Sequence, residues 1–278
     1  MLINRKIAFR LLFAFTLTWI FHPAFSFANG QERDIYQFEQ RLIQLVETSD
    51  YLSMRTLGVV KHDTFSSPIQ LVTFKGDAVK KKNVFICGGV HGDEPAGPEA
   101  VLATIIEVAN DPSKYEHVNI DFVPLVNPSG WVNGTRLNAA GEDINRDFHL
   151  LKSQEAIIIN DYLLSRRRYK LMIDHHEDAR YPGFYVVTYG NDHLSLVSDV
   201  TQKVKESGYP LRSFERNEGY FNVSKKMTPK LKNKTFMSYA RSHYSKMAYQ
   251  IESPISPNMR DRTIMHSMAD QEFINSLR

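Results

Sequence analysis

The hydrophobic positions of the chain follow first a helical period and then strand-like runs. In 34–47, apolar residues recur every three or four positions, which is the spacing of an amphipathic helix. Short apolar runs at 54–60 and 68–74, joined by a polar turn, predict two strands of a hairpin. The segment 83–87 is apolar throughout and ends in two glycines, the pattern of a buried parallel strand that meets a loop.

Helix and strand patterns then alternate to the end of the chain. The expected helices are 98–110, 153–167, 193–207, 235–244 and 259–277, and the expected strands are 118–126, 169–173, 183–189 and 246–251. This alternation predicts a single α/β domain with a mixed, largely parallel twisted sheet and helices on both faces. Ligands of such sheets bind beyond the carboxyl ends of the strands, so polar residues at those ends are the candidates for function.

The N-terminal residues have a different pattern. Three basic residues precede an apolar run at 11–21 that is too short to cross a bilayer comfortably, and Pro23 interrupts it. Small residues at and before Ala28 offer a cleavage site. We therefore expect a signal peptide at 1–28, a catalytic domain at 29–278, and a periplasmic or secreted protein with no stable membrane span after cleavage. An uncleaved membrane anchor is the alternative.

Composition narrows the class of protein. The 278 residues are 42% hydrophobic and contain 34 basic and 31 acidic residues. Removing the expected signal peptide leaves 31 of each, which gives no reason to expect a nucleic-acid partner. The segment 201–246 keeps eleven basic residues against three acidic ones, and either a solvated face or an anion-attracting rim would explain this excess. The single cysteine, Cys87, excludes an internal disulfide and a cysteine-rich zinc site.

Two groups of possible metal ligands follow predicted strands. His91 and Glu94 are three residues apart directly after the strand that ends at Cys87, so an imidazole and a carboxylate can converge on one cation. A catalytic zinc site usually takes a third protein ligand, and His175 and His176 follow another predicted strand. Successive strand side chains point to opposite faces, so only one of this pair should reach the metal. The spacing alone leaves both open.

Four ordered motifs make the chain resemble the zinc carboxypeptidases, whose fold is that of carboxypeptidase A. They are Gly-x-His-Gly-Asp-Glu at 89–94, Asn-Pro-Ser-Gly-Trp at 127–131, Arg-x-Asn at 136–138 and Gly-Glu-Asp-Ile-Asn-Arg-Asp-Phe at 141–148. The resemblance runs from about residue 84 to the end of the chain. The compact Arg-x-Asn and Asn-Arg arrangement is most similar to bacterial murein peptide amidases, and more distantly to succinylglutamate desuccinylase and aspartoacylase.

The resemblance implies one bound zinc ion with His91, Glu94 and His176 as its ligands. It also implies that Glu252, after the predicted strand 246–251, is the general base. Zinc lowers the pKa of its bound water from 15.7 to about 7, and a nearby carboxylate can then accept the proton and pass it to the leaving amine.

Three further residues have roles implied by the resemblance. Arg136 would polarise the attacked carbonyl and stabilise the oxyanion that forms, and one such donor is typically worth roughly 3 kcal/mol. Asn145 and Arg146 would bind a carboxylate of the substrate, because a guanidinium grips a carboxylate through two parallel N–H groups. Together these residues would make the enzyme read a free carboxylate.

We therefore expect a zinc metallocarboxypeptidase or amidase that hydrolyses an amide bond next to a free carboxylate in a short peptide, with a peptidoglycan stem peptide as the leading substrate. An N-acyl amino acid deacylase of the succinylglutamate desuccinylase or aspartoacylase type is the nearest alternative. A non-catalytic cell-wall-binding relative is the third. The chain has no Gly-x-Ser-x-Gly motif and no phosphate-binding glycine loop, which disfavours other hydrolase mechanisms.

Overall fold

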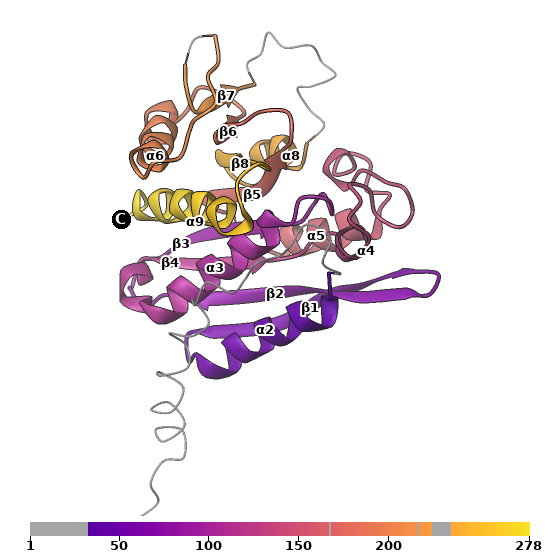
Figure 1. Ribbon diagram of the computed structural model, residues 1–278. Helices are drawn as coiled ribbons and strands as arrows, with labels where there is room; N and C mark the ends of the chain where they lie inside the picture. Colours follow the sequence, from indigo (N-terminus) through magenta and orange to yellow (C-terminus); the bar gives the residue numbers. More distant parts are fainter. Residues whose placement is uncertain (1–32, 167, 216, 224–234) are drawn as a thin grey trace, which may run out of the picture.

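A twisted eight-stranded sheet forms the centre of the molecule, with strand order β1-β2-β4-β3-β5-β8-β6-β7 (Figure 1). The computed structural model describes residues 33–166, 168–215, 217–223 and 235–278, so the expected signal peptide at 1–28 lies outside the described residues. The strands are β1 (Leu52–His62), β2 (Phe65–Lys75), β3 (Lys82–Gly88), β4 (Val118–Val123), β5 (Leu171–Asp178), β6 (Tyr185–Thr188), β7 (Tyr220–Asn222) and β8 (Met247–Pro254).

The sheet is mixed, as the alternation of patterns predicts. Strands β4, β3, β5 and β8 are consecutive neighbours and all run parallel, and β7 is parallel to β6. The antiparallel pairs are the hairpin β1-β2, the pair β2-β4 and the pair β6-β8. The single-domain α/β architecture with a largely parallel centre is therefore confirmed.

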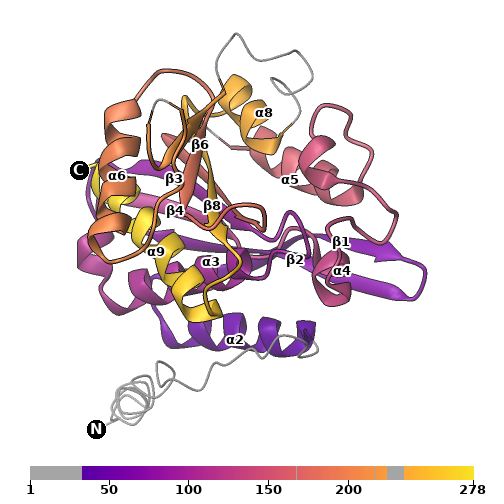
Figure 2. The same ribbon diagram turned by 45° about the horizontal axis from the view of Figure 1, so that its top comes forward.

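Helices cover both faces of the sheet (Figures 1 and 2). One face packs against α2 (Ile35–Thr48), α3 (Ala96–Asn110), α6 (Leu194–Glu206) and α9 (Met259–Asn275), and the other against α5 (Gln154–Leu164) and α8 (Phe236–His243). The remaining helical segments of the described residues are α4 (Pro128–Asn133) and two short 3-10 turns, η1 (Pro112–Tyr115) and η2 (Ile144–Arg146).

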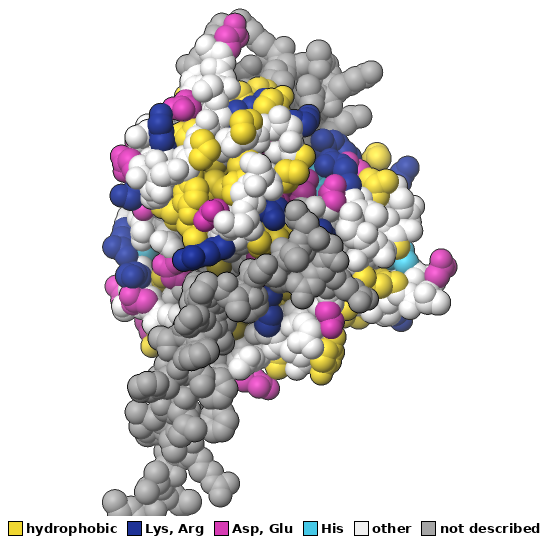
Figure 3. All heavy atoms as spheres, viewed as in Figure 1, with side chains coloured by type: hydrophobic (Ala, Val, Ile, Leu, Met, Phe, Trp, Pro, Cys, Tyr) yellow, Lys and Arg dark blue, Asp and Glu magenta, His cyan; other side chains and the backbone are white. Residues whose placement is uncertain are grey.

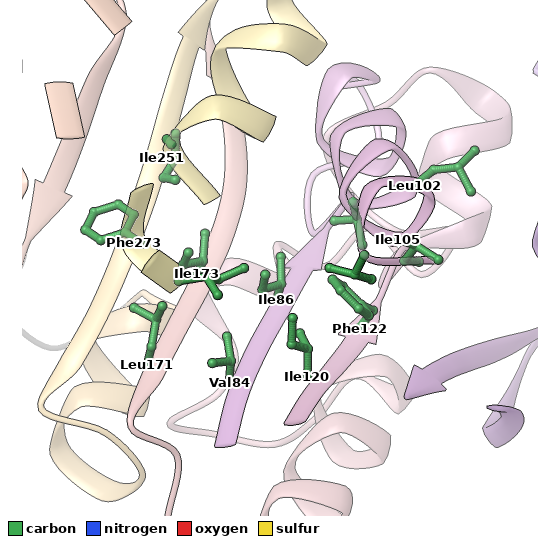
Figure 4. Close-up of a cluster of buried hydrophobic side chains, with 14 of the residues drawn as sticks. Val84, Ile86, Leu102, Ile105, Ile120, Phe122, Leu171, Ile173, Ile251 and Phe273 are labelled. Atoms are coloured by element: carbon green, nitrogen blue, oxygen red, sulfur yellow. The ribbon is translucent and has the colours of Figure 1, made fainter. Parts of the chain in front are cut away.

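The alternation of strand side chains divides the core in two. Ile86 and Ile173 point to the α3 and α9 side, where Figure 4 shows them beside Phe273 of α9 and the side chains of α3. Phe85 and Met172, their sequence neighbours, pack on the other face with α5 and α8. Because both faces are covered, β3 is apolar on both sides over 84–87, and β5 is apolar on both sides over 171–173.

Side-chain caps fix where several helices begin. Asp34, Ser153, Thr235 and Asn258 each accept a hydrogen bond from a backbone N–H of the first turn, and Thr235 forms a reciprocal capping box with Ser238. These residues lie within two positions of the helix starts expected from the hydrophobic pattern.

The largest difference from expectation lies at the end of β5. The expected strand 169–173 stops where the polar residues begin, but β5 continues to Asp178 and buries all eight of its residues. The strand can continue because β8 pairs with it over its whole length, from Leu171 to Asp178. The short helix α4 and strand β7 have no clear periodic pattern, and neither is predicted.

Across the described ranges, we find no helix that combines the length and apolar character needed to cross a membrane. On the face of the molecule in Figure 3, hydrophobic side chains gather over the part of the sheet near β6 and β7.

Candidate active site

His91 and Glu94 lie in the loop between β3 and α3, at the carboxyl end of a central strand. The loop passes so close to α4 that a Cβ on Gly92 would lie 2.0 Å from the carbonyl carbon of Gly130, so only glycine fits there. His176 comes from the neighbouring strand β5. One ligand atom from each of the three side chains lies within 4.8 Å of the others, and all three residues are buried.

The three side chains face one another through their nitrogen and oxygen atoms. The two Glu94 oxygens lie 2.7 Å from His91 Nδ1 and 2.7 Å from His176 Nδ1, and the two Nδ1 atoms are 3.0 Å apart. Two imidazole nitrogens and a carboxylate are the ligand types that a catalytic zinc site uses. The residues present therefore fit a zinc ion and form the His-x-x-Glu and distant His pattern of zinc carboxypeptidases.

The charges of the cluster favour a cation at its centre. Although burial opposes it, His176 and His91 hold the pKa of Glu94 well below its usual range. Burial likewise acts against the charged form of His176, but Asp174 and Glu94 raise its pKa well above the ordinary value. The site thus stabilises positive charge next to an ionised carboxylate.

The structure separates His175 from His176. His176 points to the same face as Met172 and Asp174, whereas His175 points to the opposite face with Ile173. There, His175 Nδ1 lies 2.9 Å from Nδ1 of His266, and its Nε2 lies 3.0 Å from Oδ2 of Asp270, both on α9. His175 therefore belongs to a buried polar cluster between the sheet and α9, and it lies outside the candidate zinc site.

Each histidine of the site has a carboxylate at its other ring nitrogen. Asp174 Oδ2 lies 2.8 Å from His176 Nε2, and Asp143 Oδ1 lies 3.4 Å from His91 Nε2, a charge contact without aligned hydrogen-bond geometry. Such partners fix the ring orientation and strengthen the ligand. Sequence reasoning assigned no role to these two aspartates. The strand period would have placed Asp174 on the same face as His176, but it could not have found Asp143.

Arg136 lies directly beside the ligand atoms. Its NH1 is 3.1 Å from His91 Nδ1 and 3.6 Å from Glu94 Oε1, and its Nε and NH2 hold Asp143 Oδ2 at 3.2 and 3.1 Å. Although burial opposes it, His91 and then Arg136 keep the pKa of Asp143 well below its usual range. The expected carbonyl-polarising group is therefore next to the metal ligands, held by an ionised carboxylate.

Asn145 and Arg146 lie together in η2 but have different surroundings. Asn145 is buried, its Oδ1 accepts a hydrogen bond from Phe236 N at 2.8 Å, and its Nδ2 lies 3.5 Å from His176 Nε2. Arg146 is exposed, and among the described residues the only hydrogen bond found for its guanidinium runs from NH1 to the Asn145 carbonyl, at 3.5 Å. Arg146 is therefore the member of this pair that is open to solvent, and the Asn145 amide lies beside His176.

Glu252 lies on β8, directly opposite His176 of β5 in the parallel register. It is 7% exposed, and its Oε1 accepts a hydrogen bond from Gln250 Nε2 at 2.5 Å. Burial raises the pKa of Glu252 to about 7, although the charge of His176 and the hydrogen bond from Gln250 act against the rise. A carboxyl group with a pKa near neutrality, beside a metal site, is suited to accept and return a proton.

The buried His-Glu-His cluster at the carboxyl ends of a mixed parallel sheet defines a zinc carboxypeptidase-like protein. The model of the succinylglutamate desuccinylase/aspartoacylase catalytic domain matches residues 80–253, which is more than half of the chain. The chain belongs to this family. The sequence motifs are more similar to those of murein peptide amidases than to those of this family. The resemblance to murein peptide amidases stays a prediction.

Solved structures share the fold. A protein from Shewanella amazonensis with a proposed metallopeptidase assignment superposes with a TM-score of 0.72 at 22% identity, covering 88% of this chain and 93% of that one. A metallo-carboxypeptidase from Burkholderia cenocepacia gives a TM-score of 0.71 at 18% identity, covering 87% of this chain and 68% of that one. At these identities the likeness shows the fold, which is carboxypeptidase-like as expected.

Curated carboxypeptidases match over shorter stretches. Carboxypeptidase SOL1 of Arabidopsis thaliana is 37% identical over 68 residues, which are 22% of this chain and 14% of that protein. Carboxypeptidase 2 of Trichophyton tonsurans is 34% identical over 101 residues, 35% of this chain and 19% of that protein. The matched segments are at most about a fifth of the length of these relatives.

The assignment of His176 rather than His175 as the third ligand is testable with a matched pair of variants. His176→Ala should lower zinc affinity by at least roughly 100-fold, because it removes a ligand rather than an outer partner. His175→Ala should keep one zinc per chain but lose about 1–3 kcal/mol of stability, since Asp270 loses a buried partner. Zinc titration and denaturant unfolding measure both effects. Zinc loss in His175→Ala and retention in His176→Ala would contradict the assignment.

Proposed function

We propose that the protein is a zinc-dependent metallocarboxypeptidase or amidase that hydrolyses an amide bond next to a free carboxylate. The observation that carries this proposal is the placement of Glu252 opposite His176 and of Arg136 against His91 and Glu94. A proton acceptor and an oxyanion-stabilising cation thus flank one candidate metal site. These are the groups that amide hydrolysis needs.

The protein groups divide the reaction between them. When bound by His91, Glu94 and His176, a zinc ion supplies Lewis acidity and a nucleophile at neutral pH. Glu252 takes the proton of the attacking water and returns it to the nitrogen of the leaving amine. Arg136 donates hydrogen bonds to the carbonyl oxygen as negative charge develops on it.

Arg146 orients the substrate. Its exposed guanidinium binds the free carboxylate through parallel N–H groups, and the Asn145 amide lies between it and the metal ligands. Fixing the carboxylate places the scissile carbonyl near Arg136 and Glu252, which lowers the entropic part of the barrier.

A peptidoglycan stem peptide is the substrate that we propose first. Its support is the N-terminal pattern of a signal peptide, which would send the chain to the periplasm or outside the cell, and the motif resemblance to murein peptide amidases. A short peptide with free carboxylates suits a site that offers an exposed arginine beside the metal ligands.

The second candidate is an N-acyl amino acid deacylase, and the family match at residues 80–253 is the observation that favours it. The same ligands and the same base would release an acyl group from an amino acid whose carboxylate lies on Arg146. The two candidates share their chemistry and differ in the substrate group on the acyl side of the bond.

Glu252→Gln tests the shared mechanism. The variant should bind one zinc per chain and lose at least about 100-fold in kcat, because the amide cannot accept the proton. The exposed Glu206→Gln is the matched control and should keep full activity. Mass spectrometry of muropeptides, N-succinylglutamate and N-acetylaspartate after incubation identifies the substrate class. Undiminished turnover by Glu252→Gln would exclude Glu252 as the base.

The pH profile depends on Gln250 because its side chain donates a hydrogen bond to the ionised form of Glu252. Glu252 must be deprotonated to act, so kcat/KM should rise with pH through its pKa. Gln250→Met removes the donor and raises that pKa, which should move the acidic limb upward by about 1 pH unit. Gln202→Met, an exposed change on α6, is the control. A limb that stays in place or moves downward would contradict the assignment.

A further inference from the structure

Arg212 has an unusual environment within the basic segment 201–246. Its guanidinium carbon lies 3.1 Å from the ring centroid of Tyr181, 4.4 Å from that of Phe214 and 4.7 Å from that of Tyr185. The side chain is 19% exposed. Three aromatic rings thus exclude much of the water from this cation and restrict its orientation.

The N–H groups of the Arg212 guanidinium lack hydrogen-bond acceptors among the described residues. Among the described residues, none accepts a hydrogen bond from it, and its nearest carboxylate oxygen, Asp178 Oδ2, is 3.8 Å from NH1. The two carboxylate oxygens of Asp178 already accept hydrogen bonds from other groups. Its Oδ1 accepts from the backbone N and the Nε of Arg180 at 3.0 and 2.9 Å, and its Oδ2 accepts from Arg180 NH2 at 3.0 Å and from Tyr185 OH at 2.6 Å.

Asp178 cannot by itself neutralise both arginines that lie beside it. Asp178 carries one negative charge, and the two arginines beside it carry two positive charges. Arg180 is 77% exposed and donates two guanidinium hydrogen bonds to Asp178. Arg212 is mostly shielded from water and donates no hydrogen bond to Asp178. Burying a guanidinium without hydrogen-bond acceptors costs free energy unless an anion pairs with it.

The position of Arg212 relative to the sheet connects it to the candidate active site. Asp178 is two residues after His176 on β5 and therefore points to the same face. Tyr185 of β6 is directly opposite Glu252 of β8 and shares its face, and its hydroxyl reaches Asp178. Tyr185, one of the three rings around Arg212, is thus the strand neighbour of Glu252 on the side opposite to His176.

We propose that Arg212 binds a second carboxylate of the substrate, in addition to the one that Arg146 binds. The proposal rests on the proposed function, since it assigns specificity to the same site. The three rings hold the guanidinium plane, so that its edge can present two parallel N–H groups to a carboxylate. The enzyme then selects substrates that carry an acidic residue beside the scissile bond as well as a free terminal carboxylate.

Paired peptides test this specificity. The probes are N-acetylated dipeptides and tripeptides with a free terminal carboxylate, in which the residue on either side of the scissile bond is Glu or Gln. The wild-type enzyme should prefer Glu over Gln at one of these positions by about tenfold in kcat/KM, as expected for one charged hydrogen-bonded pair. Arg212→Met should reduce this ratio to about 1, and Arg212→Lys, which keeps the charge but loses the fork, should leave an intermediate ratio.

Arg180→Met is the matched control. It removes a neighbouring arginine that pairs with the same aspartate, and it should leave the Glu/Gln ratio unchanged. A wild-type ratio near 1 at both positions, or a ratio that persists in Arg212→Met and Arg212→Lys, overturns the proposal. A ratio that collapses equally in Arg180→Met also overturns it, because the effect would then belong to the local charge rather than to Arg212.

Calorimetric titration separates this proposal from the proposed function. Zinc-loaded Glu252→Gln protein, with and without Arg212→Met, is titrated with the same Glu and Gln peptides. Tighter binding of the Glu peptide that depends on Arg212 supports the second carboxylate site, even if the wild-type enzyme hydrolyses neither peptide, which would refute the proposed activity alone. Equal affinities for the two peptides, or no binding of either, overturn the assignment of Arg212.

Discussion

The parallel pairing of β5 with β3 on one side and β8 on the other is the constraint on which the site depends. This register puts Gly88 beside His175 and His176 beside Glu252. The loop after β3 therefore delivers His91 and Glu94 to the side chain of His176, and the next strand delivers the base. A shift of one residue in β5 would exchange His176 for His175 and turn Asp174 away from the site.

Both faces of β5 are polar at its end, and each side has its own set of partners. On the site face, Asp174 and Glu94 hold His176. On the opposite face, Asp270 receives hydrogen bonds from His175 and from Thr104 of α3, so it joins α3, α9 and the sheet. Burying polar groups costs free energy unless each forms a hydrogen bond or an ion pair. These contacts offset that cost, so the polar end of β5 can be buried.

Sequence patterns predict most of the framework because its helices and strands bury apolar residues with regular periods. The order of elements, the hairpin at the edge and the largely parallel centre all follow from this periodicity. The polar end of β5 does not, because its burial depends on partners from α3, α9 and β8 that lie far away in sequence. The same is true of α4, which is held by contacts around Gly130 rather than by an apolar stripe.

The candidate site could be predicted in unequal parts. His91 and Glu94 follow from local spacing, and the choice of His176 came from family resemblance. The tertiary fold adds Asp143, which reaches His91 and Arg136 together, and Gln250, which holds Glu252. Arg212 could be recognised only from the three rings around it, since one arginine in a basic segment has no distinguishing sequence pattern.

We infer that one zinc ion binds among His91, Glu94 and His176, beside Glu252 and Arg136. Anomalous diffraction at the zinc absorption edge, from crystals of the zinc-loaded protein, would locate this ion. We expect a single strong peak bounded by Nδ1 of His91, Nδ1 of His176 and the carboxylate of Glu94. A peak beside His175 and His266, or no peak within ligand distance of these three residues, would contradict it.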